Sequence, residues 1–337
     1  MGKIKVLSEN DIRKLINLDI VVKAVENAYK QKSNNKGNVW PLVLYEYEHD
    51  VFDLDIRSGN LIDSKAYGLK LISYNENNPN NGLPKVYGTA LIFNGETGEP
   101  LALLNAAPIT SYRTGVAAAI GAKYLARNNS KNLLVIGNGN IAKYSVAATL
   151  FLMPEIENVY VYNSRRILST DELNLFKNEI NKLLNDSGRE LKANFNIVND
   201  IKEITSNSDI IITTTPSYEK LIDDSWVSDG THISCMGACI PDQQEIDENL
   251  FKRARIFADD INQCLKHGEA QKAYNKKIIN TFDAEIGSVI LGNIKGRIND
   301  SDITIFDSTG LFIQDLSTSL ELIKESNKQK IGTEIEL

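Results

Sequence analysis

The sequence contains few of the residues that build disulfide frameworks or metal sites: its 337 residues include three cysteines and three histidines. Three cysteines are too few for a disulfide framework. Cys235 and Cys239 are spaced as C-x3-C, but no second ligand pair follows, so we expect no metal site. No apolar run approaches the roughly 20 residues that span a bilayer, and the N-terminus lacks the apolar core of a signal peptide. We therefore expect a cytoplasmic protein without a membrane partner.

An excess of positive charge is also missing. The formal net charge is −7, which argues against a nucleic-acid partner but leaves room for a local basic pocket that binds a phosphate. Hydrophobic residues make up 42% and charged residues 24%, an ordinary globular balance. The length of the chain suits two domains.

The first 110 residues mix helical and strand patterns. Ser8 and Asp11 form a capping box, and Asp19 is placed to cap a second helix. Strand patterns follow at residues 42–56, at 67–74 and, as a hairpin, at 88–104. The pair Asn94-Gly95 suits a hairpin turn that needs a positive φ. This part of the chain is predicted to be an α+β unit.

From residue 131 onward, short apolar runs alternate with amphipathic helices, which predicts a parallel sheet covered on both faces. The tail from about residue 310 returns to a helical pattern, and we expect it to pack back on the first unit. The predicted fold class is therefore α/β: a Rossmann domain at residues 116–309, and a discontinuous α+β domain at residues 1–115 with 310–337.

A glycine loop carries the strongest functional signal. An apolar strand leads into G-x-G-x-x-A, in which Gly137 permits a tight turn, Gly139 admits a pyrophosphate and Ala142 allows close helix packing. Asn140 and Ile141 open the helix, whose amide groups and dipole bind phosphate. The strand, loop, helix and second strand occur in the required order. This context favours a dinucleotide site over a chance glycine turn.

The second strand of this unit ends without the carboxylate that usually binds the ribose of NAD. Asn163, Ser164, Arg165 and Arg166 stand there instead, which favours the 2′-phosphate of NADP, with NAD as the alternative. The arginines could instead begin a solvated loop. The run Thr213–Pro216 follows a later strand, where Thr214 and Thr215 either meet the nicotinamide ribose or only end the strand.

Several motifs along nearly the whole chain resemble those of the ornithine cyclodeaminase/μ-crystallin family. In order, they are Tyr67-Gly68-Leu69-Lys70, Gly82-Leu83-Pro84, residues 96–102, Tyr112-Arg113-Thr114-Gly115, the Gly137 loop, Phe306-Asp307-Ser308-Thr309-Gly310 and Gln314-Asp315. The resemblance implies a homodimer formed through the N-terminal domain and a substrate pocket between the domains. It also implies chemistry at the α-carbon of a small amino or imino acid.

The resemblance assigns roles to individual residues. Lys70 matches the catalytic lysine, the alternative being an exposed strand lysine, and Arg113 matches the residue that holds the substrate carboxylate. An early strand departs from the family pattern, because it reads Trp40-Pro41-Leu42 where many members have an arginine after the proline. Arg57 is a candidate for this second carboxylate contact, or else pairs with Asp55 or Asp53 at the surface. Thr114 is predicted to begin a helix whose amino end faces the cofactor phosphates. The candidate cofactor residues are Thr114, Gly137, Gly139, Asn140, Ile141, Ala142, Asn163, Ser164, Arg165, Thr214, Thr215 and Ser308.

The turn at residues 237–245 also departs from the family pattern. Where cyclodeaminases have G-A-D-x-P-G-K-x-E, this chain places Cys239 at the catalytic aspartate and Asp242-Gln243 at the Gly-Lys pair. A thiol cannot replace a carboxylate as the partner of a substrate ammonium. Asp242 could compensate through a shifted turn, and Cys239 itself is either a nucleophile or a packed thiol.

Three hypotheses follow. The first is a nicotinamide-dependent oxidoreductase acting at the α-carbon C–N bond of a small amino or imino acid, with the nicotinamide facing Lys70 and Arg113. The second is redox-neutral cyclisation of ornithine to proline with loss of ammonia. The third is a non-catalytic protein that binds a dinucleotide.

Overall fold

The computed structural model describes residues 2–49 and 51–336, which form two compact units. One unit combines Met1–Arg113 with Leu311–Leu337, and the other is Thr114–Gly310. These boundaries lie within two residues of the predicted ones. The assignment of substrate binding and dimerisation to the first unit remains a prediction.

A mixed sheet forms the centre of the first unit. Its strand order is β16-β1-β7-β6-β5-β4-β2, and β3 pairs with β4 outside this path. The elements of the unit are β1 (Lys3–Leu7), α1 (Glu9–Leu15), α2 (Leu18–Ser33), β2 (Gly37–Val39), β3 (Val43–Glu48), β4 (Phe52–Leu61), β5 (Ala66–Asn75), η1 (Asn78–Asn81), β6 (Val86–Asn94), β7 (Pro100–Asn105), α10 (Phe312–Gln329) and β16 (Thr333–Glu336).

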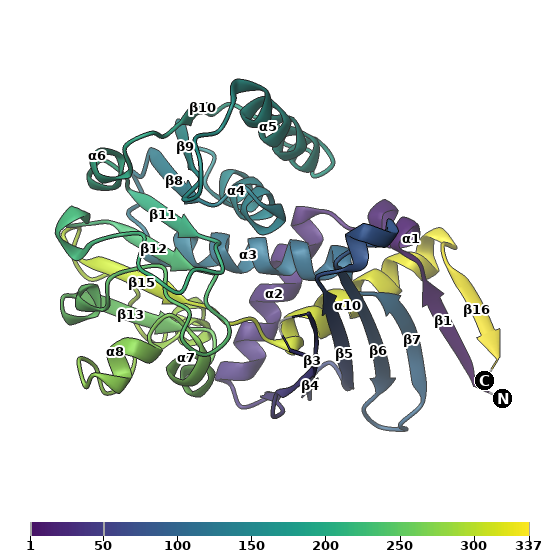
Figure 1. Cartoon of the computed structure of the whole chain (residues 1–337). Helices are drawn as coiled ribbons and strands as arrows, with labels where there is room; N and C mark the ends of the chain where they lie inside the picture. The colour runs from purple at the N-terminus through teal and green to yellow at the C-terminus, as the bar shows by residue number, and fades with distance from the viewer. Residues whose placement is uncertain (1, 50, 337) are drawn as a thin grey trace. The chain divides into compact units, whose positions relative to one another are not determined.

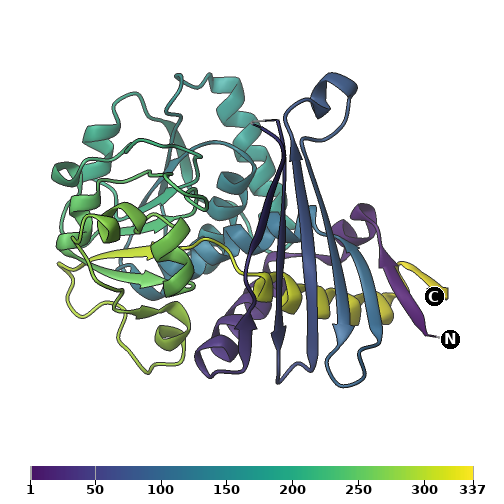
Figure 2. The same cartoon turned by 60° about the horizontal axis from the view of Figure 1, so that its bottom comes forward.

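The C-terminal helix α10 returns to this sheet, as the sequence predicted. In Figure 2 it runs in yellow beside the strands of the unit, and it packs against β4, β5 and α2. Its residues Phe312, Ile313 and Leu316 are buried, so the helix supplies apolar contacts that strands near the N-terminus need. The alternation of side chains along β5 places Lys70 on one face of the sheet and Leu69 and Leu71 on the other.

Three local details of the first unit differ from the sequence predictions. The capping box at Ser8 is confirmed, but the second helix is capped by the side chain of Asn17, while Asp19 pairs with Lys23 in its first turn. The segment 42–56 contains parts of two strands, because β3 ends at Glu48 and β4 begins at Phe52. In the β6–β7 hairpin the positive φ belongs to Gly98, at 77°, and not to Asn94-Gly95.

The second unit is a parallel, doubly wound α/β unit, and this confirms the predicted fold class. Its strand order is β10-β9-β8-β11-β12-β15-β13-β14, and every neighbouring pair in this order is parallel (Figure 1). The elements are β8 (Asn132–Ile136), α4 (Asn140–Leu152), β9 (Asn158–Tyr162), α5 (Thr170–Asn185), β10 (Asn194–Ile197), α6 (Ile201–Ser206), β11 (Ile210–Thr213), η2 (Asp224–Trp226), β12 (His232–Cys235), η3 (Glu248–Lys252), β13 (Ala254–Ala258), α7 (Ile261–His267), α8 (Gln271–Asn275), β14 (Ala284–Glu285), α9 (Ile286–Ile290) and β15 (Ile303–Asp307).

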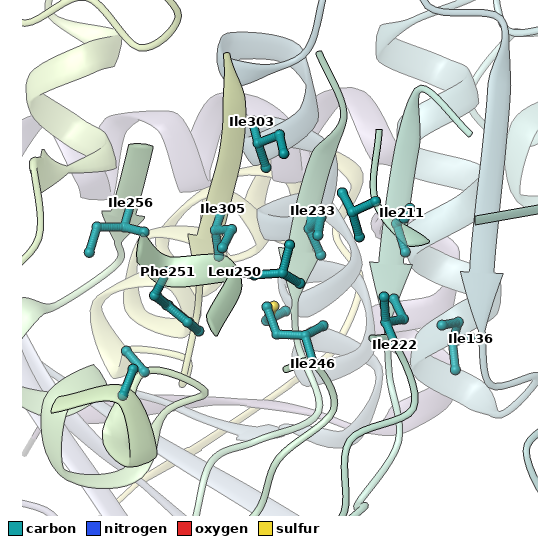
Figure 3. Close-up of a cluster of buried hydrophobic side chains, with 14 of the residues drawn as sticks. Ile136, Ile211, Ile222, Ile233, Ile246, Leu250, Phe251, Ile256, Ile303 and Ile305 are labelled. Carbon is teal, nitrogen blue, oxygen red and sulfur yellow. The ribbon is translucent and has the colours of Figure 1, made fainter. Parts of the chain in front are cut away.

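A core of isoleucines holds the second sheet together. Figure 3 shows Ile136, Ile211, Ile233 and Ile305 projecting from neighbouring strands into one buried cluster. Each is fully buried, and burial of such a side chain contributes about 1.5–3 kcal/mol. The uninterrupted apolar runs in the sequence are thus explained by strands that are covered on both faces.

The helix that carries the Arg-Thr-Gly motif begins earlier than predicted. α3 (Ala107–Leu125) places Thr114 in its interior, so the expectation that Thr114 begins a helix is wrong. Gly115 has a packing reason, since a Cβ atom there would lie 2.4 Å from the backbone carbon of Tyr144 in α4. Within residues 2–49 and 51–336, no helix combines the length and apolarity that a membrane span requires.

Candidate functional site

The glycine loop joins β8 to α4 at the carboxyl edge of the second sheet. Gly137 has a φ of +104°, which favours glycine. A Cβ atom there would also lie 2.6 Å from the hydroxyl of Thr214, so the space excludes a side chain as well. Gly139 caps α4, and a Cβ atom there would meet nothing within 4 Å. That empty space is what the approach of a pyrophosphate needs, and Ala142 behind it is fully buried.

A cavity of about 320 Å³ opens over this loop. It lies where β8 neighbours both β9 and β11, the switch point at which doubly wound sheets bind ligands. The structure brings together seven predicted cofactor residues there and adds Asn138, Pro216 and Ser217, which were not among the predicted contacts. The lining is Gly137, Asn138, Gly139, Asn163, Ser164, Arg165, Thr214, Thr215, Pro216 and Ser217.

The loop after β9 is held in place by Asn163. Its Oδ1 accepts the backbone N–H groups of Arg165 (2.8 Å) and Arg166 (3.2 Å), and its Nδ2 donates to Asn138 Oδ1 (2.8 Å). The two arginines differ. Arg166 forms a two-point ion pair with Glu172, and this guanidinium lowers the pKa of that carboxyl to about 2. Arg165 lines the cavity and forms no ion pair with any described residue, so one guanidinium, and not two, stands available for a phosphate.

The remaining predicted cofactor residues lie outside this lining. Asn140 and Ile141 form the first turn of α4, and Thr114 lies inside α3. Ser308, directly after β15, donates its hydroxyl to Asp259 Oδ2 at 2.8 Å and is buried. Cofactor contacts of these residues remain predictions.

Lys70 occupies the inner face of β5 in the first unit. Its side chain is fully buried, and its Nζ donates to Asp315 Oδ1 (2.7 Å) and to the hydroxyl of Thr110 (3.1 Å). Burial lowers the pKa of this ammonium to about 8, although the neighbouring Asp315 charge opposes that effect. A lysine with such a pKa can both hold and release a proton near neutral pH.

Asp315 joins Lys70 to Arg113. Arg113 Nε lies 3.3 Å from Asp315 Oδ2, and its NH1 donates to Gln314 Oε1 at 3.2 Å. Gln314 in turn donates to the hydroxyl of Tyr29 at 2.5 Å. Burial raises the pKa of Asp315, but the Arg113 and Lys70 charges outweigh it, so the net pKa is lowered and the carboxylate is ionised. The result is a buried cluster of two cations around one anion.

Arg57 lies directly opposite Lys70 in the β4–β5 register, on the same face of the sheet. Its Nε donates to Asp55 Oδ2 at 3.1 Å, and the two side chains are only 11% and 17% exposed. The pair with Asp55, the alternative to a carboxylate contact, is thus present, but it does not lie at the surface. A role in substrate binding remains a prediction.

Cys239 lies in the turn after β12. Its backbone N–H donates to Gln243 Oε1 at 3.0 Å, and its side chain is half-buried, whereas Cys235 and Cys264 are buried. Burial raises the pKa of those two thiols well above the ordinary value, so neither supplies a thiolate.

Asp242 in the same turn has a φ of +68°, a region that disfavours side chains with a Cβ atom. We expect Asp242→Gly to be more stable than Asp242→Ala by about 1 kcal/mol, measured by urea unfolding. We also expect Asp242→Gly to keep its activity. Loss of turnover in a folded Asp242→Gly protein would show instead that the carboxylate compensates for the missing aspartate at 239.

Asp315 lies within one of the sequence motifs, but the motif assigns it no role. Its helix periodicity marks it only as a polar residue near the start of α10. The signal that could have found it is its chemistry: a buried lysine and a buried arginine both require an anion. Asn138 carries no sequence signal of its own, because it occupies the unspecified position of the G-x-G motif.

Comparisons with known proteins give a consistent result. Residues 3–330 match the family described as the Ornithine cyclodeaminase/mu-crystallin family. The alanine dehydrogenase of Archaeoglobus fulgidus is 34% identical over 98% of this chain and 97% of its own. The similar solved structures include two with a TM-score of 0.87. One is an archaeal alanine dehydrogenase dimer with bound NAD (33% identical, 99% of each chain covered). The other is Thermococcus litoralis Δ1-pyrroline-2-carboxylate reductase with NADH and L-proline (30% identical, covering 98% of this chain and 99% of that chain).

Proposed function

The chain belongs to the ornithine cyclodeaminase/mu-crystallin family, and from this premise we propose that it is a nicotinamide-dependent oxidoreductase. Its substrate is a small amino or imino acid, and the reaction occurs at the α-carbon C–N bond. The observation that carries the proposal is the buried Lys70–Asp315–Arg113 cluster, which unites a proton-exchanging amine with a carboxylate-binding guanidinium. The named activities of the similar proteins, alanine dehydrogenase and pyrroline-2-carboxylate reductase, are of this class.

The dinucleotide occupies the cavity over the glycine loop. Gly137 and Gly139 admit the pyrophosphate, and the first turn of α4 offers its N–H groups to the phosphates. When bound, the nicotinamide supplies hydride transfer to or from the substrate carbon. Thr214 and Thr215 form the wall of the cavity beside the loop.

The cluster in the first unit binds the substrate and moves its proton. Arg113 presents a planar pair of donors to the substrate carboxylate, while Gln314 and Asp315 fix its orientation. Lys70 exchanges a proton with the substrate nitrogen or with a bridging water. Asp315 is a positioning residue, because it acts through these two cations.

A turnover screen tests the proposal. The full chain is assayed with each dinucleotide against 2-oxo acids plus ammonia or amines, cyclic imines, and ornithine. We expect the absorbance of reduced nicotinamide to change in proportion to product. Release of ammonia from ornithine without net change of that absorbance would instead show cyclodeamination. Tight dinucleotide binding without turnover on any substrate would show a binding protein.

We further propose that the chain accepts NADP through Arg165, with NAD as the alternative that the solved relatives hold. Arg165→Ala should reduce the ratio of NADP to NAD affinity by about tenfold or more, because it removes a charge-assisted contact with the 2′-phosphate. Arg166→Ala is the matched control and should change the ratio less than threefold, since Glu172 already engages that guanidinium. Calorimetric titration measures both ratios. Equal effects of the two substitutions would contradict the proposal.

We propose that the protein is a homodimer formed through the outer face of the first sheet, and that it functions in the cytoplasm. Leu69, Leu71, Val43, Tyr45 and Tyr87 share that face, opposite to Lys70, and are between 36% and 58% exposed. An apolar face of this kind marks a protein interface. The archaeal alanine dehydrogenase is described as a dimer.

The dimer prediction is tested by placing charge on this face. Leu69→Glu with Leu71→Glu should convert the dimer into a monomer in sedimentation experiments, because like charges buried without partners oppose association. Ile167→Glu, at an exposed apolar residue of the second unit, should leave the dimer intact. A dimer that survives the double substitution would exclude this face.

A further inference from the structure

Glu245 is a fully buried residue in the loop between β12 and η3. Its Oε1 accepts the backbone N–H (2.6 Å) and the hydroxyl (2.7 Å) of Thr215. Its Oε2 accepts the hydroxyl of Thr213 (2.6 Å) and the backbone N–H of Gly237 (2.9 Å). Thr213 ends β11 and Gly237 follows β12, so one carboxylate joins the carboxyl ends of two neighbouring strands.

The space around this carboxylate is tight. A Cβ atom at Gly237 would lie 2.4 Å from Glu245 Oε2 and 2.1 Å from the carbonyl oxygen of Thr215. The carboxylate therefore sets how closely the turns after β11 and β12 approach each other.

The turn that Glu245 holds is also a wall of the dinucleotide cavity. Thr214 and Thr215 line that cavity, and the hydroxyl of Thr214 donates to the carbonyl of Ile136 at 3.0 Å, directly before the glycine loop. Any change at Thr215 is thus passed to the cavity and to the packing against Gly137.

We propose that Glu245 is a positioning residue for the bound dinucleotide: its ionised carboxylate holds the Thr213–Thr215 turn against the Gly237 turn, and its protonation weakens dinucleotide binding. This inference rests on the function proposed above, and it concerns a residue that does not line the cavity itself.

The chemical reason is the number of acceptors. An ionised carboxylate accepts hydrogen bonds on both oxygens, whereas a protonated carboxyl or a glutamine amide has one good acceptor. The two backbone N–H groups, from Thr215 and Gly237, point at different oxygens. Either neutral group therefore leaves one of these N–H groups without a suitable partner.

The pKa of Glu245 lies within the pH range in which binding can be measured. Burial raises its pKa to about 7, and the hydrogen bonds from Thr213, Thr215 and Gly237 oppose this effect. The other titratable groups nearby are Glu269, Asp307 and Cys235, each with a pKa raised by burial. Glu269 Oε1 accepts the N–H groups of Glu245 and Ile246, at 2.7 Å each. No lysine or arginine pairs with Glu245 or Glu269 among the residues described.

Stability and affinity should respond to pH in opposite directions. Between the ordinary glutamate pKa of 4.5 and about 7, the folded state binds a proton at Glu245 that the unfolded state does not. The contribution of this group to stability therefore falls as pH rises through that window. Dinucleotide affinity, which depends on the ionised form, should rise there. A merely structural glutamate would move both quantities together.

The experiment is a calorimetric titration of the full chain with NAD, which carries no 2′-phosphate to titrate, at pH 6 and pH 8. We expect the Kd of the unsubstituted protein to be about tenfold higher at pH 6, the effect of one lost hydrogen bond. Glu245→Gln should show the higher Kd at both pH values. Glu219→Gln, at an exposed residue of the same unit, should follow the unsubstituted protein.

Two further variants sharpen the test. In Glu269→Gln the amide carbonyl can still accept both N–H groups, because Glu269 Oε2 makes no hydrogen bond with a described residue, so the Kd should change less than threefold. Thr213→Val removes a bond to the ionised form, so it should raise the pH midpoint of binding. This shift decides the matter if Glu245→Gln does not fold.

A Kd that does not vary with pH, a Glu245→Gln protein that binds like the unsubstituted one, or an unchanged midpoint in Thr213→Val would each overturn the inference. Absence of NAD and NADP binding by the unsubstituted protein would refute the proposed function instead.

Discussion

Replacing Lys70 with methionine is expected to lower kcat by about 10³-fold, since proton transfer by a positioned side chain contributes roughly 10²–10⁴-fold. Methionine keeps an apolar side chain of similar length in the buried position on β5 but cannot exchange a proton. Dinucleotide binding should change less than twofold, because the glycine loop belongs to the other unit. Stopped-flow absorbance of reduced nicotinamide and an equilibrium titration measure the two quantities.

The pH dependence of the unsubstituted enzyme gives a second readout for Lys70. With a pKa of about 8, the ammonium form dominates below pH 8 and the neutral amine above it. Imine reduction that needs a proton donor should therefore slow as pH rises through 8, while amino acid oxidation that needs a base should accelerate. Both of these pH dependences of the rate should be absent in Lys70→Met. Lys85→Met, at a half-exposed lysine paired with Glu76, is the control and should retain both pH dependences. Full activity in Lys70→Met would remove this residue from the mechanism.

Replacing Asp315 with asparagine should lower the free energy of unfolding by about 3–5 kcal/mol, because it leaves two buried cations without their shared anion. The same change removes the charge that raises the pKa of Lys70, so the pH midpoint of activity should fall below that of the unsubstituted enzyme. Chemical denaturation and a pH–rate profile measure these effects.

The control for Asp315 lies on the same helix. Glu321 pairs with Lys324 at the surface, and Glu321→Gln should leave both the unfolding curve and the pH midpoint unchanged. An Asp315→Asn protein that is destabilised but keeps the original midpoint would show that Asp315 has a structural role only.

Local patterns were sufficient where neighbouring residues decide the structure. The Gly137 loop needed a strand before it and a helix after it, and all of these lie within one short segment. The capping box at Ser8 likewise depends on residues three positions apart. The same local reasoning was wrong for Asp19, because Asn17 offers an equally good cap two residues earlier, and for Thr114, because α3 begins before the motif.

Local sequence patterns could not predict which side chains from distant parts of the chain pair with each other. Two arginines follow β9, and only the position of Glu172 at the start of α5 shows that one of them is already paired. In the sequence, Glu245 is one acidic residue in a loop. Its proposed role depends on two turns that the parallel pairing of β11 and β12 brings together.

Contiguous residues were enough to predict the doubly wound unit and the glycine loop, because hydrophobic periodicity and short motifs are properties of neighbouring positions. The candidate roles of Lys70 and Arg113 came from the resemblance of their motifs to those of the family. Which charged side chains pair with one another depends on the folded chain. Lys70 and Asp315 are 245 residues apart in the chain and 2.7 Å apart in the fold. Electrostatic interactions depend on distance in space and on exclusion of water, and neither quantity can be obtained from separation along the chain.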